Sequence, residues 1–225
     1  MRTMSTRTER AERRSDALSK ERIVQAAIEL LDAGGEAALT FRALAAHLAT
    51  GSGAIYWHVT NKQELLAAAA ADVIERVMAE VVRRKEPRKA IRALAGGVFD
   101  AIDAHPWVGT QLAQAPWETA LLRIFEAIGG QLRALGVPQK AQFDAACALL
   151  NYILGIAAQN AANARAQAPG ADRATVLGDV ARRWQSLDPD AWPFVHQVAA
   201  QLPRHDDRGQ FLAGIDWLLD GMTTR

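Results

Sequence analysis

Apolar residues recur every three or four positions along most of the chain, the spacing that places them on one face of an α-helix. In the first such stretch a capping serine precedes the apolar face and a glycine pair at 34–35 follows it. That face is formed by Ile23, Ala26, Ala27, Leu30 and Leu31. No run alternates with the two-residue period of a half-buried strand. The pattern predicts an all-α fold.

Three short helices are predicted in the first sixty-odd residues. The first starts at the cap Ser19, and the second, about 41–48, starts at the cap Thr40. A break at 49–51 leads into the third, about 52–59. Asn61 then caps a long fourth helix, with Glu64 three residues later in a capping-box pattern. The second and third helices, joined by a tight turn, have the outline of a helix-turn-helix.

Prolines divide the rest of the chain into further helical segments. These are predicted at about 88–104, 107–115, 117–134, 138–164, 172–185, 190–202 and 206–222, with a loose loop at 164–175. We therefore expect an N-terminal tail at 1–18, a helix-turn-helix DNA-binding domain at 19–66, and a larger helical domain at 67–225 for ligand binding and dimerisation.

The third helix has an outward side that suits DNA. It is too short to be stable alone, so Ile55 and Val59 must face the preceding helices. The outward side then consists of Ser52, Gly53, Tyr56 and Trp57. Hydroxyl and indole groups donate to phosphates, ring edges contact thymine methyls, and glycine allows close approach in a major groove. Alternatively, the two aromatic rings pack between domains.

Three neighbouring side chains extend this surface. Arg42, at the start of the second helix, can reach a guanine edge or a phosphate. Thr40 and Lys62 flank the unit, where the backbones of the duplex would pass.

Net charge gives no bulk signal for nucleic acid, since it is only +1 over 225 residues. The basic groups must therefore act locally. Five arginines in the first eighteen residues form either a solvated tail or an arm that enters a minor groove. They are Arg2, Arg7, Arg10, Arg13 and Arg14. No apolar segment follows them, as a signal peptide would require.

Other classes of protein find little support. No apolar run approaches the ~18 residues of a membrane span, and the single cysteine, Cys147, fits a reducing cytoplasm. No nucleophile, phosphate-loop or metal-binding motif is present, and the histidines are scattered. An enzyme is therefore disfavoured, and no cofactor or metal is expected.

The stretch 39–66, LTFRALAAHLATGSGAIYWHVTNKQELL, resembles the DNA-binding domain of the tetracycline-repressor (TetR) family of transcriptional regulators. Its pieces "LT.RALA..L", "A.Y.H" and "NK.ELL" stand at the spacing of that family, and the likeness extends over residues 23–66. Near the other end, "FLAGIDWLLDGM" resembles the last helix of tetracycline repressors. The resemblance implies a two-fold dimer, most simply a repressor, that binds a palindromic operator and is released by a ligand in its C-terminal domain.

The resemblance also assigns DNA contacts by position. Arg42, Ser52 and Gly53 fall where the family reads bases. The positions that hold phosphates and adjoining bases are occupied by Thr40, Tyr56, Trp57, His58 and Lys62.

The turn departs from the usual Leu-Gly-Val-Ser of the family, because residues 48–51 read Leu-Ala-Thr-Gly. Ala49 replaces a glycine suited to a left-handed turn, at about 1 kcal/mol if that conformation is kept. Gly51 replaces a capping side chain, which leaves Thr50 or Ser52 as candidate substitutes. The Ser-Gly-Ala start of the third helix also has less hydrogen-bonding capacity than a glutamine-containing reader. We expect a different operator from the tetracycline operator, with more reliance on Arg42 and DNA shape.

The alignment with tetracycline repressors further suggests the class of effector. Residues 94, 98, 112 and 116 stand where those repressors carry polar and metal-chelating groups, but here they are Leu, Val, Leu and Pro. A small apolar or aromatic effector therefore fits better than magnesium–tetracycline. The candidate lining comprises Met78, Leu94, Val98, Trp107, Leu112 and Trp117, with Asn151 and Gln159 as polar groups. Ordinary core or interface packing is the alternative for the aromatic residues.

Two apolar segments, 138–164 and 206–222, could bury their stripes within the chain. The resemblance instead favours a homodimer held by a four-helix interface of these segments.

An alternative function is a DNA-binding regulator whose C-terminal domain contacts a protein partner in place of a small molecule.

Overall fold

The computed structural model describes residues 18–114, 119–166 and 172–223, which form helices and turns without a strand. The predicted all-α fold is thus confirmed. The helices are α2 (Lys20–Ala38), α3 (Phe41–His47), α4 (Ser52–Tyr56), α5 (Lys62–Val81), α6 (Pro87–Ala104), α7 (Pro106–Gln114), α8 (Thr119–Ala134), α9 (Gln139–Ala166), α10 (Arg173–Gln185), α11 (Pro193–Ala199), the 3-10 helix η1 (Leu202–Arg204) and α12 (Asp207–Thr223).

The predicted caps start the helices of the N-terminal unit. The side chains of Ser19 and Thr40 accept hydrogen bonds from backbone N–H groups in the first turns of α2 and α3. The side chain of Asn61 accepts from the Glu64 N–H at 2.8 Å. The glycine pair interrupts α2 with non-helical dihedrals and a φ of +65° at Gly35, and one more turn follows as far as Ala38.

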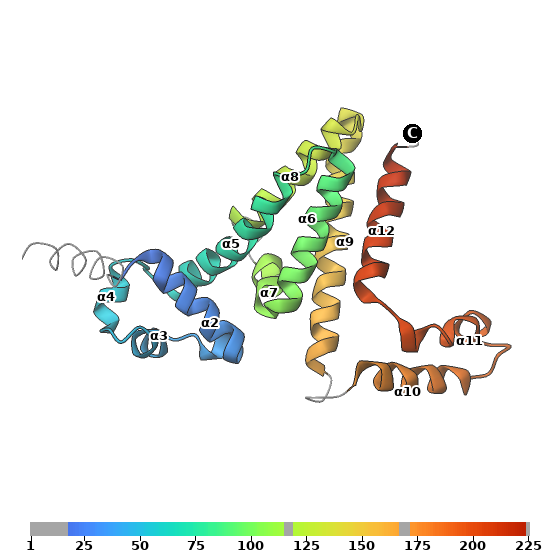
Figure 1. Ribbon diagram of the computed structural model, residues 1–225, viewed down its shortest axis with the longest axis horizontal. Helices are drawn as coiled ribbons and strands as arrows, with labels where there is room; N and C mark the ends of the chain where they lie inside the picture. The colour runs from blue at the N-terminus through green and yellow to red at the C-terminus, as the bar shows by residue number, and fades with distance from the viewer. Residues whose placement is uncertain (1–17, 115–118, 167–171, 224–225) are drawn as a thin grey trace, which may run out of the picture.

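Helices α2, α3 and α4 gather at one end of the molecule, and α5 runs from them into the larger helical part (Figure 1). There α6 packs against α5, α8, α9 and α12. The position of α6 is central, and its buried face, which includes Ile91, Leu94, Val98 and Ile102, forms much of the core.

Helix α12 lies beside α6 and α9 (Figure 1). Arg88 and Arg92 of α6 pair with Asp216 of α12. Gly214 makes room for α9, because a Cβ added there would meet the Tyr152 hydroxyl at 1.9 Å. The close approach of α12 to α9 at Gly214 therefore occurs within one chain.

Several predicted segment boundaries shift. The segment 190–202 contains only the short α11, and α9 continues to Ala166, into the predicted loop. The remainder of that loop includes 167–171, which lie outside the described residues, as do the N-terminal arginines. Helices α10 and α11 project from the body as an arm (Figure 1).

By length and composition, one helix within the described ranges could cross a membrane, at Gln139–Asn163. This finding corrects the expectation that no apolar run is long enough. The same helix packs against α6, α7, α8 and α12 in the helical body.

Candidate DNA-binding surface and effector region

The helix-turn-helix buries one face of α4 and exposes the other. Ile55 and Val59 are buried together with Leu44 of α3. Tyr56 is 54% exposed, and its ring stacks on that of Phe41 at a centroid distance of 4.4 Å. Trp57 is 90% exposed, so its ring does not pack between domains. Two adjacent aromatic side chains are therefore available at the surface.

Helix α4 is shorter than the predicted 52–59, because Tyr56 is its last residue and Trp57 its C-cap. The segment His58–Thr60 forms a turn that leads to α5, in which His58 is half-buried. Ser52 and Gly53 are exposed in the first turn of α4. A Cβ built on Gly53 meets nothing within 4 Å, so the chain itself leaves space in front of this residue.

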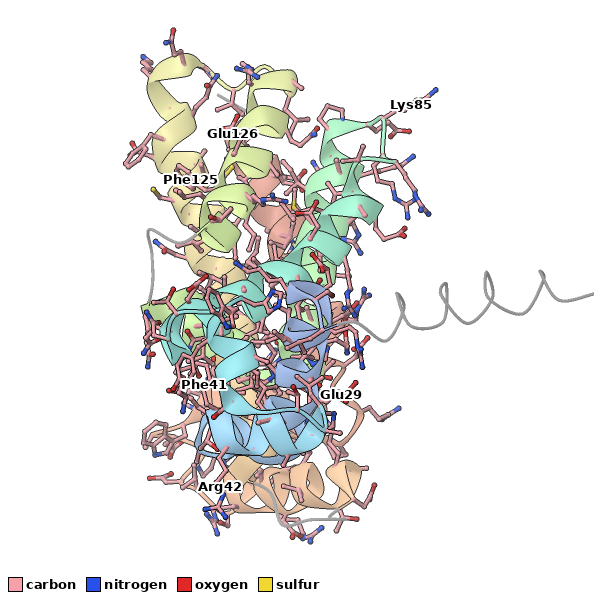
Figure 2. All side chains as sticks on the ribbon, turned by 90° about the vertical axis from the view of Figure 1, so that its left-hand side faces the viewer. Glu29, Phe41, Arg42, Lys85, Phe125 and Glu126 are labelled. Carbon is pink, nitrogen blue, oxygen red and sulfur yellow. The ribbon has the colours of Figure 1, made fainter. Side chains whose placement is uncertain are left out.

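Arg42 lies at the start of α3, and its side chain points away from the domain (Figure 2). Within the described ranges it forms no hydrogen bond or ion pair, and it is exposed. Thr40 is also exposed, although its hydroxyl accepts from the Ala43 N–H at 3.1 Å. Lys62 donates to the Glu36 carbonyl oxygen at 2.6 Å, which holds its ammonium near the end of α2.

The turn before α4 keeps the left-handed geometry expected from the family pattern. Ala49 has a φ of +51°, in the region that favours glycine. Gly51 occupies the N-cap of α4 and supplies no side-chain hydrogen bond. In the described part of the chain neither Thr50 nor Ser52 supplies one instead, so the expected substitute cap is missing.

A carboxylate connects the start of α5 to the start of α2. Glu64 accepts from the Thr60 N–H at 2.8 Å and from the Lys20 ammonium at 3.3 Å. The hydrogen bond from the Thr60 backbone is the main cause that lowers the pKa of Glu64. The ionised carboxylate therefore helps to hold α5 against the DNA-binding unit at neutral pH.

A second contact joins the DNA-binding unit to the C-terminal domain. The Trp107 indole Nε1–H of α7 donates to Asp32 Oδ1 of α2 at 2.8 Å. The His105 Nδ1 atom, at the junction of α6 and α7, lies 2.7 Å from the same oxygen. These residues are 73 and 75 positions from Asp32, so no short-range sequence signal could have identified the contact.

The structure brings some candidate effector residues together and separates others. Leu94, Val98, Trp107 and Leu112 are buried in the same hydrophobic core. Met78 lines a different, open cavity of about 520 Å³ between α5 and α8. Trp117 lies outside the described residues.

The two polar candidates, Asn151 and Gln159, are exposed on α9. The opposite side of that helix carries the buried residues Leu149, Ile153 and Ala157. Asn151 and Gln159 therefore do not share the core of Leu94 and its neighbours within this chain.

Comparison with known proteins agrees with this arrangement. The family model described as "Bacterial regulatory proteins, tetR family" matches residues 23–69. An HTH-type transcriptional regulator of Saccharopolyspora erythraea is 31% identical over 151 residues, which are 66% of this chain and 64% of that protein. The chain thus matches slightly less than two thirds of the length of this curated relative.

Solved structures match over nearly the whole chain. A TetR-type transcriptional regulator of Streptomyces coelicolor is 52% identical, with a TM-score of 0.85 and coverage of 92% of this chain and 99% of that one. BioQ with its natural double-stranded DNA operator is 25% identical, with a TM-score of 0.61 and coverage of 93% and 100%. ActR of Streptomyces coelicolor, in complex with actinorhodin, shares the fold at 23% identity, with a TM-score of 0.74 and coverage of 91% and 95%.

The matched proteins are regulators of transcription and not enzymes. The match over residues 23–69 includes the exposed surface of α3 and α4, and the similarity to solved regulators extends through the C-terminal helices. The chain belongs to the TetR family of DNA-binding transcriptional regulators.

Proposed function

We propose that the chain is a cytoplasmic, ligand-responsive repressor that binds a palindromic operator as a homodimer. A small, largely apolar or aromatic effector releases it from DNA. Residues 19–66 bind the operator, and residues 67–225 bind the effector and form the dimer. The observation that carries the proposal is the exposed surface of Arg42, Tyr56 and Trp57 on a buried helix-turn-helix framework.

The DNA contacts follow from this surface. Arg42 and the start of α4, with Ser52 and Gly53, read base edges in the major groove. Thr40, Tyr56, Trp57, His58 and Lys62 hold the phosphates and adjoining bases. Lys62 keeps two further N–H donors beside the one that bonds the Glu36 carbonyl. BioQ, which shares the fold, was solved with its double-stranded DNA operator, and this supports DNA binding by the present chain.

The dimer is supported by an exposed stripe along α9. Its members recur every three or four residues and are small or polar: Ala148, Asn151, Gly155, Ala158, Gln159 and Ala162. A Cβ added to Gly155 meets nothing within 4 Å, so packing inside the chain does not require a glycine there. Small side chains at this spacing permit a close approach of a second helix. We assign this face of α9 to the two-fold contact, together with α12.

The effector assignment rests on the apolar character of the C-terminal core. Leu94, Val98, Trp107 and Leu112 supply apolar walls. The complex of ActR with actinorhodin shows that this fold accommodates a small molecule in a related protein. An effector that favours a dimer with splayed recognition helices lowers affinity for half-sites about 34 Å apart.

A protein partner is the second candidate for control. Trp192 and Phe194 are exposed on the arm, at 53% and 69%. Large exposed apolar side chains are typical of interaction sites. Regulation that persists without any small molecule, and requires these two side chains, would favour this alternative.

Selection of bound DNA from a random duplex pool tests the function. We expect enrichment of a palindrome whose affinity falls steeply as salt rises. Arg42→Ala should lose the preferred base at one position of each half-site, at a cost of about 1–3 kcal/mol per half-site. Arg133→Ala, at an exposed position on α8, is the matched control and should bind normally. A folded dimer that enriches no sequence would contradict the proposal.

A further inference from the structure

A cavity of about 400 Å³ lies between the DNA-binding unit and the C-terminal domain. Its walls come from α2, the start of α5 and α7, and so from both sides of the contact between Asp32 and Trp107. The residues that matter for its chemistry are Leu31, Asp32, Glu36, Leu66, Trp107 and Gln111. This cavity borders the apolar core assigned to the effector, because Trp107 belongs to both.

Gln111 brings to the cavity an amide that has no hydrogen-bond partner in the described part of the chain. Its side chain is only 8% exposed, yet within the described ranges its amide forms no hydrogen bond. Although most of the side chain is buried, the amide atoms themselves remain accessible to solvent, so they can exchange a hydrogen bond to water for one to a ligand. Gln111 lines the cavity, so a molecule bound there could supply the missing partner.

The charges of the cavity favour a cation. Two carboxylates, those of Asp32 and Glu36, contribute to the walls. The nearest ammonium is that of Lys62, 3.8 Å from Glu36 Oε1. Asp32 bonds Trp107 and His105 through Oδ1, which leaves Oδ2 to accept from a ligand. The two carboxylates are paired with one ammonium and one imidazole, that of His105, and both keep acceptor oxygens for a bound cation.

The remaining walls are apolar. Leu31, Leu66 and Pro106 line the cavity beside the large ring of Trp107. Such walls suit the body of an organic ion better than a hydrated metal ion, and an aromatic ring additionally attracts cations.

We propose that this cavity binds a small organic cation that carries N–H donors on an apolar or aromatic body, such as an aromatic amidine. The amidinium group donates to Asp32 Oδ2 and to the Glu36 carboxylate, and Gln111 accepts a further N–H through its amide oxygen. The site shares only Trp107 with the proposed effector lining. The proposal does not rest on the proposed operator binding, because a ligand can be detected on the protein without DNA.

Three benzene derivatives of similar size and different charge test the proposal, with binding to the full chain measured by isothermal titration calorimetry. Benzamidine carries the cation, benzamide is its neutral counterpart, and benzoate is the anion. We expect benzamidine to bind with a Kd on the order of 1 mM. Benzamide should bind about tenfold more weakly, because it lacks the charge that the carboxylates attract. Benzoate should give no detectable heat of binding.

Two variants locate the site. Gln111→Leu keeps a similar volume without the amide, and Glu36→Gln removes one carboxylate. Each should weaken benzamidine binding by about fivefold or more. Glu29→Gln, on the same helix but outside this cavity, is the matched control and should bind as the unchanged protein does.

The proposal is overturned by equal binding of benzamidine and benzamide, or by no binding of benzamidine well above the expected Kd. Unchanged affinity in both cavity variants would also overturn it. Circular dichroism establishes that each variant is folded. Since Glu36 is exposed, Glu36→Gln decides the outcome if Gln111→Leu does not fold.

Discussion

At the scale of single residues, Ala49 shows how the helix-turn-helix keeps its geometry without the usual glycine. Its φ of +51° lies in the left-handed region. The Ala49 N–H bonds the Ala46 carbonyl at 3.2 Å, and the Thr50 N–H bonds the Ala45 carbonyl at 2.9 Å. This is the pair of hydrogen bonds of a Schellman motif, which ends α3 and directs the chain to α4. The hydrogen bonds of the turn hold the alanine in a costly conformation.

Ala49→Gly should therefore stabilise the protein. Glycine adopts the left-handed region without the clash of a Cβ, so we expect the free energy of unfolding to rise by about 1 kcal/mol. Urea denaturation measures the change. Ala46→Gly, at an exposed position inside α3, is the control and should lower the same free energy by about 0.5–1 kcal/mol. Loss of stability in Ala49→Gly would contradict this account of the turn.

At the scale of secondary-structure elements, Asp32 joins α2 to α7 through one oxygen. The contacts to Trp107 and His105 connect the helix that begins the DNA-binding unit to the junction of two helices of the C-terminal domain. A displacement of α7 would therefore break or strain these contacts to α2. We place the mechanical link between effector and operator at this contact.

Trp107→Phe tests the hydrogen bond to Asp32, because it removes the indole N–H and keeps an aromatic ring in the core. We expect the free energy of unfolding to fall by about 1–3 kcal/mol, since the lost hydrogen bond has a charged acceptor and the smaller ring fills less space. Chemical denaturation measures the change, and Trp217→Phe, at a side chain that is 72% exposed, should leave it within about 0.5 kcal/mol. Equal effects of the two substitutions would argue against a specific link.

At the scale of the whole molecule, α9 has two faces with different tasks. Leu149, Ile153 and Ala157 are buried in the chain, whereas Ala148, Gly155 and Ala158 are exposed. The arm of α10 and α11 carries further apolar side chains into solvent, including Trp192 and Phe194. A single chain therefore leaves apolar and small side chains exposed on α9 and on the arm, and we assign only the face of α9 to the proposed dimer.

Ala158→Arg should separate the dimer into folded monomers. A large charged side chain at the centre of the proposed contact prevents close approach of the second α9 and would be buried without a partner. Light scattering during gel filtration measures the mass, and operator affinity should fall with the loss of the second half-site. Ala79→Arg, at an exposed position on α5, should remain dimeric. A dimeric Ala158→Arg would remove this face of α9 from the interface.

The N-terminal unit could be predicted in detail because its signals are local. A cap acts over three residues, as at Thr40 and Ala43, and helical periodicity alone places Ile55 inside and Tyr56 outside. The left-handed turn at Ala49 was likewise predicted from the family spacing. The length of α4 was not predicted correctly, because helix propensity does not determine where so short a helix ends.

The C-terminal domain was predicted only in outline. Helix α9 is apolar or small around much of its circumference, so periodicity does not say which side the chain covers. The prediction that Asn151 and Gln159 contact the effector is therefore not met within this chain, because both side chains are exposed. The sequence predicts that Met78 and Leu94 both line the effector pocket. In the structure, Leu94 is buried in the core, whereas Met78 lines a separate cavity between α5 and α8.

The sequence by itself determined the helical class, the caps, the helix-turn-helix and the exposed aromatic side chains of its last helix, since each depends on residues within a few turns of one another. Only the tertiary structure decided which contacts join the two domains. The bond from Trp107 to Asp32 spans 75 positions, and Gln111 lines a cavity because α7 packs against α2 and α5. Such contacts depend on how whole helices pack against one another, and the local spacing of apolar residues carries no information about that packing.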